Sequence, residues 1–200
     1  MRIILIGASG TIGREVAKAL AVNNEVITAS RSGGDLQVDM ADPESVTALF
    51  QTVGAFDAVV STAGSARFGP LDELSYDDFL FSFRNKLMGQ VNLVRMGRNF
   101  INANGSFTLT SGVLAREPMP GSSAVSMVNA GLEGFVRAAQ LELEREVRVN
   151  VVSPVWVQET LLAMGHRELE GMPAALVARA YVASVTGTMK GQVLDVNDYT

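Results

Sequence analysis

The chain opens with a buried-strand pattern followed at once by three regularly spaced glycines, and this start restricts the fold most strongly. Residues 3–6 form a short, wholly apolar run of the kind that a parallel strand buried on both faces carries. Gly7, Gly10 and Gly13 follow, and a segment with helical spacing of its apolar residues comes next. A glycine turn between a strand and a helix lets the backbone approach a pyrophosphate closely, and the helix end offers free N–H groups. The start therefore predicts a nucleotide-binding α/β domain.

Strand-like and helix-like segments alternate along the rest of the chain. Such alternation predicts right-handed crossovers and a parallel sheet covered by helices on both faces. We therefore expect a single domain over residues 1–200, with a doubly wound parallel sheet of about seven strands of the Rossmann type. Residues 158–172 have the weakest pattern and are interpreted as a mobile loop over a site. The predicted strands are 3–6, 25–29, 36–38, 57–61, 106–110, 148–152 and 192–196, and the predicted helices are 12–20, 43–51, 74–100 in one or two pieces, 123–146 and 173–185.

Composition and charge exclude several classes of function. The chain carries a net charge of −5, and it has only three lysines, which argues against a nucleic-acid partner. It has no cysteine and one histidine, His166, so we expect no disulfide, no thiolate chemistry and no metal site. No run approaches the roughly 18 apolar residues that a membrane span needs. We expect a cytoplasmic protein with a small-molecule substrate.

The end of the second predicted strand points to the choice of nucleotide. An acidic residue there binds the ribose 2′-hydroxyl of NAD and repels a 2′-phosphate. Here the strand ends in Ser30, Arg31 and Ser32, where the guanidinium could bind a phosphate and the hydroxyls could donate beside it. This pattern predicts NADP(H). The alternatives are a glycine turn that binds no ligand and an arginine that is merely solvated.

At this point the chain resembles a short-chain dehydrogenase/reductase over nearly all of its length. The glycine spacing matches the family's cofactor turn, and residues 61–64, 110–112, 148–154 and 191–196 are similar to its later strand-end signatures. At 200 residues the chain is shorter than the usual member, so we expect a reduced substrate-binding part. The glycine turn, the second strand end and the resemblance together place these residues against the cofactor: Gly7, Ser9, Gly10, Thr11, Ile12, Gly13, Ser30, Arg31, Ser32, Asp39, Met40, Thr62, Ala63, Gly64, Pro154 and Val157.

The family's Tyr-x-x-x-Lys motif is missing from this chain. Aligning the Gly-Phe pair at 134–135 with the family places Val125 at the tyrosine and Asn129 at the lysine. In the ordinary mechanism that the resemblance implies, the tyrosine gives a proton to the carbonyl oxygen, a serine holds that oxygen, and the lysine lowers the tyrosine pKa. Ser111 matches the serine, but the ordinary proton donor is absent.

A second departure lies on the helix before the fifth strand. Lys86 stands where the family carries an asparagine three residues before a glycine, so lysine and asparagine have exchanged helices. Another register would give the asparagine role to Asn85, and a solvated surface lysine is a further alternative. We interpret Ser111, Lys86 and Asn129 as the catalytic set. Ser111 polarises the carbonyl, Lys86 contacts the nicotinamide ribose or donates the proton, and the Asn129 amide oxygen orients the amine.

These residues predict an NADP(H)-dependent oxidoreductase that acts on a small carbonyl or alcohol. Two other classes stay open, namely an NADP(H)-binding sensor without catalysis and a structural subunit that the nucleotide only stabilises. Predicted helices 74–100 and 123–146 are apolar along more than one stripe, and one stripe needs cover. Family members pair through these two helices, so the resemblance implies a homodimer or homotetramer.

Overall fold

A seven-stranded sheet organises the molecule, and the computed structural model describes all residues from 1 to 200. All neighbouring strands are parallel, in the order β3-β2-β1-β4-β5-β6-β7. The predicted doubly wound α/β class is therefore confirmed. The strands are β1 Arg2–Ile6, β2 Glu25–Ser30, β3 Leu36–Gln37, β4 Phe56–Ser61, β5 Ile101–Thr110, β6 Arg148–Ser153 and β7 Val193–Asp195.

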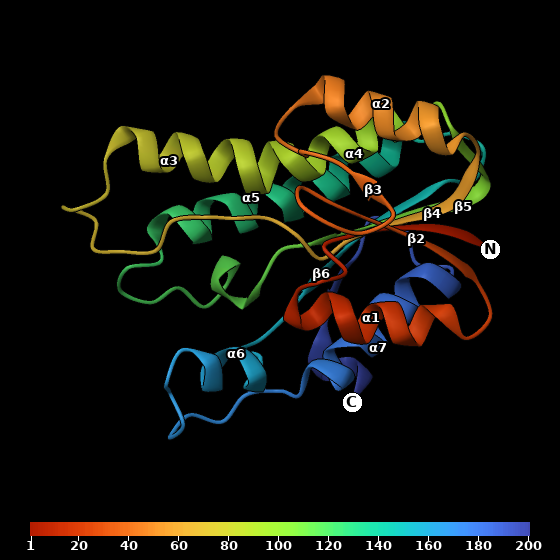
Figure 1. Ribbon diagram of the computed structural model, residues 1–200. Coiled ribbons are helices and arrows are strands. Elements are labelled where there is room, and N and C mark those ends of the chain that lie inside the picture. The colour runs from red at the N-terminus through yellow and green to blue at the C-terminus, as the bar shows by residue number, and fades with distance from the viewer.

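Helices cover both faces of the sheet (Figure 1), with α2, α4 and α5 above it and α1 and α7 below. Each layer encloses a hydrophobic cluster, and Phe50 lies in the upper one while Tyr181 lies in the lower one. Burial of both faces explains why β1 is an almost wholly apolar run that does not alternate with polar residues. The helices are α1 Thr11–Ala21, α2 Pro43–Val53, α3 Tyr76–Ser82, α4 Gly89–Gly97, α5 Ser123–Ala139, α6 Gln158–Ala163 and α7 Ala174–Thr186.

The long helix predicted over residues 74–100 is present, but it has a π-helical turn in its middle. Phe83–Met88 form this turn between α3 and α4. A π-turn inserts an extra residue into the helix and is frequent at functional sites. It contains both Asn85 and Lys86, so the local geometry turns neighbouring residues toward different parts of the molecule.

Two predicted boundaries are wrong. The helix predicted over 123–146 ends at Ala139, and a short 3-10 turn over Gln140–Glu142 follows it. Arg145 and Glu146 then adopt positive φ angles of 55° and 58°, because the chain must reverse sharply to enter β6. The fifth strand starts at Ile101, five residues before the predicted start, with an irregularity in its pairing to β4.

The segment predicted as a loop over residues 158–172 contains a helix. Gln158–Ala163 form α6, and Val157 pairs with Met172 in an isolated parallel bridge that closes the segment. Hydrogen bonds from Gln158 N to Met172 O and from Gly171 N to the Gln158 side chain fasten it further. The apolar periodicity of this segment is weak because α6 has only six residues.

None of the helices in the structure combines the length and the apolar character that a membrane span requires.

Candidate active site

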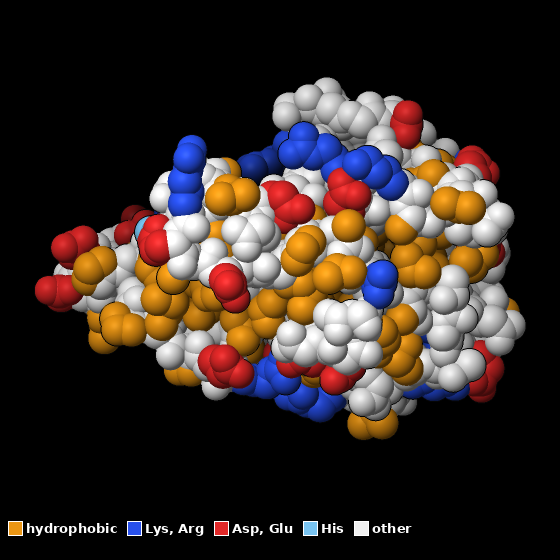
Figure 2. All heavy atoms as spheres, turned by 90° about the horizontal axis from the view of Figure 1, so that it is seen from below, with side chains coloured by type: hydrophobic (Ala, Val, Ile, Leu, Met, Phe, Trp, Pro, Cys, Tyr) orange, Lys and Arg blue, Asp and Glu red, His pale blue; other side chains and the backbone are white.

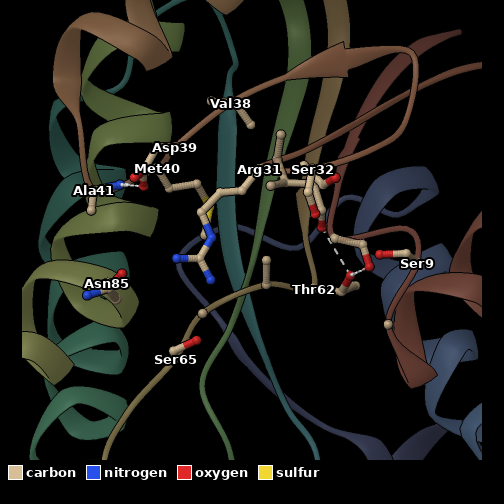
Figure 3. Close-up of a pocket in the computed structure, with 16 residues that line it drawn as sticks. Ser9, Arg31, Ser32, Val38, Asp39, Met40, Ala41, Thr62, Ser65 and Asn85 are labelled. Atoms are coloured by element: carbon tan, nitrogen blue, oxygen red, sulfur yellow. Dashed lines mark hydrogen bonds between the residues drawn. The ribbon is translucent and has the colours of Figure 1, made fainter.

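The candidate site lies where the strand order reverses between β1 and β4. In open α/β sheets the crevice at the carboxyl ends of such strands is where ligands bind. Two cavities share Thr62 at this edge of the sheet. The first has a volume of about 350 Å³ and is lined by the glycine turn and by the ends of β2 and β3 (Figure 3). The second, of about 260 Å³, lies beyond β4 toward β5 and β6.

The glycine turn is packed so tightly that side chains are excluded from it. Gly7 has a φ of +87°, and a Cβ atom there would lie 2.9 Å from the Cβ of Ala63. A Cβ on Gly13 would lie 2.0 Å from the carbonyl oxygen of Gly7. Gly13 therefore lets α1 approach β1, as the third glycine of such turns does. Gly7, Ser9 and Gly10 line the first cavity and Ile12 lines the second, whereas Thr11 and Gly13 line neither.

The amino end of α1 remains open for an anion. Gly10 caps the helix without a side-chain hydrogen bond, and the first turn carries no acidic residue. The first N–H groups of a helix lack intrahelical partners and carry partial positive charge, so they attract phosphate. The N–H groups at this helix end, beside the first cavity, are therefore suited to bind a phosphate.

Arg31 extends into the first cavity from the end of β2. Figure 3 shows its guanidinium directed between Met40 and Thr62. Arg31 is exposed and takes part in none of the seven ion pairs of the chain, so its charge is available to a ligand. Ser30 and Ser32 also line this cavity, but the Ser30 hydroxyl donates to Gly33 O at 2.6 Å. Of the three residues predicted to bind a 2′-phosphate, Arg31 and Ser32 are therefore the two whose side-chain donors have no partner in the protein.

Other residues predicted to contact the cofactor also line the first cavity. Asp39 and Met40 line the first cavity after β3. Thr62 closes it from β4 and donates its hydroxyl to Ile6 O at 3.0 Å, which ties the glycine turn to the end of β4. The first cavity is completed by Val38, Ala41, Ala63, Gly64, Ser65 and Asn85.

The second cavity brings together the three residues predicted as catalytic. Lys86 reaches it from the π-turn, Ser111 from the end of β5, and Asn129 from α5. Val125, at the position of the family tyrosine, does not line this cavity. Asn85 lines the first cavity and its side-chain nitrogen donates to Phe81 O at 2.9 Å, so of these two π-turn residues it is Lys86 that lines the second cavity. The remaining lining includes Ile12, Pro154, Val157, Leu114, Trp156 and Thr160.

Lys86 is half-buried and has no carboxylate partner. Its Nζ donates to the backbone carbonyl of Ser111 at 3.1 Å. Burial disfavours the charged ammonium and lowers the Lys86 pKa to about 8. The predicted orientation of this amine by the Asn129 amide oxygen is wrong, because the Ser111 carbonyl takes that place. The Asn129 oxygen is instead buried without any hydrogen-bond partner.

The Ser111 side chain has a partner that the sequence interpretation missed. Its hydroxyl donates to Oε1 of Glu133 at 3.3 Å, and both residues are buried. Arg116 Nε lies 3.8 Å from the same carboxylate, and Arg116 also binds Asp195. Glu133 follows Asn129 by four residues on α5, so the shared helix face was a signal that could have found it.

The residues present fit a nicotinamide dinucleotide. The glycine cradle and the open end of α1 suit its pyrophosphate, and the two adjoining cavities suit its two halves. The partnerless oxygen of Asn129 is a buried acceptor, which is costly unless a bound group donates to it. A ribose hydroxyl is such a donor. Fold and site together define the class of dinucleotide-binding α/β proteins.

Comparison with known proteins agrees with this class. The family model described as enoyl-(acyl carrier protein) reductase matches residues 7–190. The chain is 28% identical over 162 residues to hydroxynaphthalene reductase from Aspergillus fumigatus, covering 78% of this chain but only 59% of that protein. It is 29% identical over 184 residues to carbonyl reductase (NADPH) 2 from Sus scrofa, covering 82% and 74% of the two chains.

Solved structures extend the likeness to nearly the whole chain. The crystal structure of the protein lin1944 from Listeria innocua is 39% identical, with a TM-score of 0.95 over 98% of this chain and 99% of that one. A small-chain dehydrogenase solved in complex with NADPH is 29% identical, with a TM-score of 0.88 over 98% and 95%.

The chain belongs to the short-chain dehydrogenase/reductase family, whose oxidoreductases use nicotinamide cofactors. The resemblance drawn from the strand-end motifs is thereby confirmed. The Listeria protein shows the same fold at almost the same length, so the short chain is shared with at least one relative.

Proposed function

We propose that this protein is an NADP(H)-dependent reductase of small carbonyl compounds, working also in reverse on the alcohols. The observation that carries the cofactor choice is Arg31, which extends into the first cavity without a partner. No acidic residue at the end of β2 competes with it or repels a 2′-phosphate. The NADPH complex of a relative that is 29% identical supports the same choice.

The substrate would enter the second cavity beside α6. Leu114, Val155 and Trp156 line this cavity, while Leu162, Met164 and Leu169 are exposed on α6 and the loop that follows it. Figure 2, which looks at the molecule from below, shows apolar side chains in a broad band across this side. An apolar lining with a few convergent polar groups favours a small carbonyl with an apolar body.

The bound nicotinamide would supply or accept the hydride, and the residues of this chain would handle the proton. Lys86 presents an ammonium with three donors at the second cavity, and only one of them is used by the Ser111 carbonyl. With a pKa of about 8, Lys86 is poised for general acid catalysis near neutral pH. Asn129 would accept a hydrogen bond from the ribose, and the Ser111 hydroxyl would bind the substrate oxygen.

A carbonyl panel with NADPH tests this proposal, with Lys86→Met as the decisive variant. We expect turnover in the natural protein and a loss of about 10²–10⁴-fold in Lys86→Met, the usual range for a lost general acid. NADPH affinity should stay within about threefold, because the glycine turn and Arg31, which are proposed to bind the phosphates, line the first cavity away from Lys86. The exposed Lys18→Met is the matched control. Absence of turnover with every carbonyl would instead favour a binding module without catalysis.

We also propose that the protein forms a homodimer or homotetramer through the layer of α3, α4 and α5. Phe83 of the π-turn and Met127 of α5 are exposed in this layer, and apolar surface there would be covered by a second copy. The cytoplasmic location stays a prediction from the sequence.

A further inference from the structure

Gln90 lies on the first turn of α4, directly after the π-turn, and its side-chain amide is completely buried. Its Oε1 accepts a hydrogen bond from Thr110 N at 2.7 Å, and its Nε2 donates to Thr110 O at 2.8 Å. The same Nε2 lies 3.3 Å from Lys86 O, one helical turn earlier. One amide therefore joins the helix that carries Lys86 to the strand end that precedes Ser111.

The need for this amide follows from the geometry of the sheet. The last pair that β4 and β5 form is Val60 with Thr108, and beyond it Thr110 reaches β4 through its hydroxyl, which donates to Ser61 O at 2.6 Å. The backbone groups of Thr110 that face β4 consequently have no neighbouring strand. Gln90 takes the place of a strand partner with one donor and one acceptor, so the buried peptide groups of Thr110 remain paired.

The contacts form a closed circuit around the catalytic side. Lys86 Nζ donates to the carbonyl of Ser111, Ser111 follows Thr110 in the chain, and Gln90 binds Thr110 at both of its backbone groups. A shift of α4 relative to the end of β5 would therefore separate the amine from the carbonyl. The two hydrogen bonds between Gln90 and the backbone of Thr110 oppose that shift.

We propose that Gln90 is a positioning residue that holds the Lys86 amine against the Ser111 carbonyl in the catalytic chamber. The functional part of this inference rests on the proposed reductase activity. The positional part does not, because it concerns the environment of Lys86 in the protein alone.

Titration of Lys86 distinguishes positioning from a merely structural role. The chain has only three lysines, and Lys18 and Lys190 are exposed. Labelling lysine with ¹³C at Cε gives three NMR signals in the protein without cofactor, and the signal with a midpoint near pH 8 belongs to Lys86. Its absence from the spectrum of Lys86→Met confirms the assignment.

The test variant is Gln90→Met, which keeps the length of the side chain but removes its donor and acceptor. We expect the Lys86 midpoint to rise by about one pH unit toward the ordinary lysine value, because the released amine reaches water. An unchanged or lower midpoint in the folded variant would overturn the proposal.

Gln140 offers a matched control at the opposite end of the sheet. Its Nε2 donates to Val147 O at 3.1 Å and its Oε1 accepts from Val149 N at 2.8 Å, so Gln140→Met removes the same two kinds of bond. The Lys86 midpoint should not change in this control. A rise as large as that in Gln90→Met would assign the effect to general loosening and refute a specific role of Gln90.

Should Gln90→Met fail to fold, Gln90→Asn serves for the same titration, because its shorter, uncharged side chain no longer reaches both backbone groups of Thr110. Here too the midpoint should rise, and an unchanged midpoint would overturn the proposal. In turnover assays, kcat should fall by about tenfold or more while the NADPH Kd stays within about twofold. If the natural protein reduces no carbonyl, the proposed function fails, but the lysine titration still decides the role of Gln90.

Discussion

The Ser111 hydroxyl donates to Oε1 of Glu133 at 3.3 Å, and therefore points its hydrogen at a buried carboxylate. An ionised carboxylate only accepts hydrogen bonds, so it competes with a substrate carbonyl for the single hydrogen of Ser111. Glu133 of α5 therefore already binds the hydroxyl of the serine that is proposed to bind the substrate oxygen.

Replacing Glu133 by Gln should consequently accelerate carbonyl reduction. The amide can donate to the Ser111 oxygen, which frees the serine hydrogen for the substrate. A hydrogen bond of about 0.5–1.5 kcal/mol corresponds to a rise of roughly two- to tenfold in kcat/KM. Steady-state kinetics with NADPH measure it, and Asp195→Asn, which alters the other carboxylate bound by Arg116, is the control. A fall in turnover would mean that the carboxylate assists Ser111 and does not restrain it.

Arg31 should determine the preference for NADPH over NADH. We expect the natural protein to bind NADPH at least about tenfold more tightly, a difference of about 1.4 kcal/mol. Arg31→Ala should remove most of that difference by weakening NADPH binding alone, since only NADPH carries the 2′-phosphate. Isothermal calorimetry with both nucleotides measures it. Arg179→Ala removes an exposed charge outside the cavity and should leave the preference intact. Equal affinities in the natural protein would contradict the assignment.

Lys86 should make stability depend on pH in a defined window. Its folded pKa of about 8 lies below the ordinary value of 10.5, so the folded state binds fewer protons between these two values. Stability therefore rises as pH increases from about 8 to 10.5, and below pH 8 the full cost of burying the ammonium remains. Lys86→Met should stabilise the fold by about 1–3 kcal/mol at pH 7, and the gain should shrink toward pH 10.5.

Urea unfolding at a series of pH values measures this effect. Lys18→Met removes an exposed lysine and should show no such pH-dependent difference from the natural protein. A constant offset between Lys86→Met and the natural protein from pH 7 to pH 10 would show that the Lys86 pKa is not lowered by burial.

Self-association should depend on Phe83 and Met127. Light scattering at micromolar concentration should give the mass of a dimer or tetramer, because exposed apolar side chains of α5 and the π-turn would be covered by another copy. Phe83→Asp combined with Met127→Asp should shift the protein toward the monomer. Leu141→Asp changes an exposed apolar residue just after α5 and is the control. A natural protein that scatters as a monomer would refute the proposal.

The cofactor half of the site could be predicted from the sequence because it is built from local motifs. Gly7, Gly10 and Gly13 belong to one turn, and Arg31 ends the next strand, so their positions follow from the order of strands in a doubly wound sheet. The family alignment predicts a catalytic role for Lys86, and the structure places Lys86 at the second cavity together with Ser111. No sequence pattern predicted the π-turn that places Lys86 at this cavity.

The tertiary structure alone decided the hydrogen-bond partners of the side chains at the second cavity. The sequence determined that the chain folds as a doubly wound α/β domain with a nucleotide turn, since apolar periodicity and glycine spacing act over a few residues. It did not determine that Lys86 binds the Ser111 carbonyl, that Glu133 engages the Ser111 hydroxyl, or that Gln90 completes the end of β5. These contacts join residues that are 20 to 25 positions apart in the chain. They arise only when π-turn, strand end and helix are packed together, and that packing depends on the whole core.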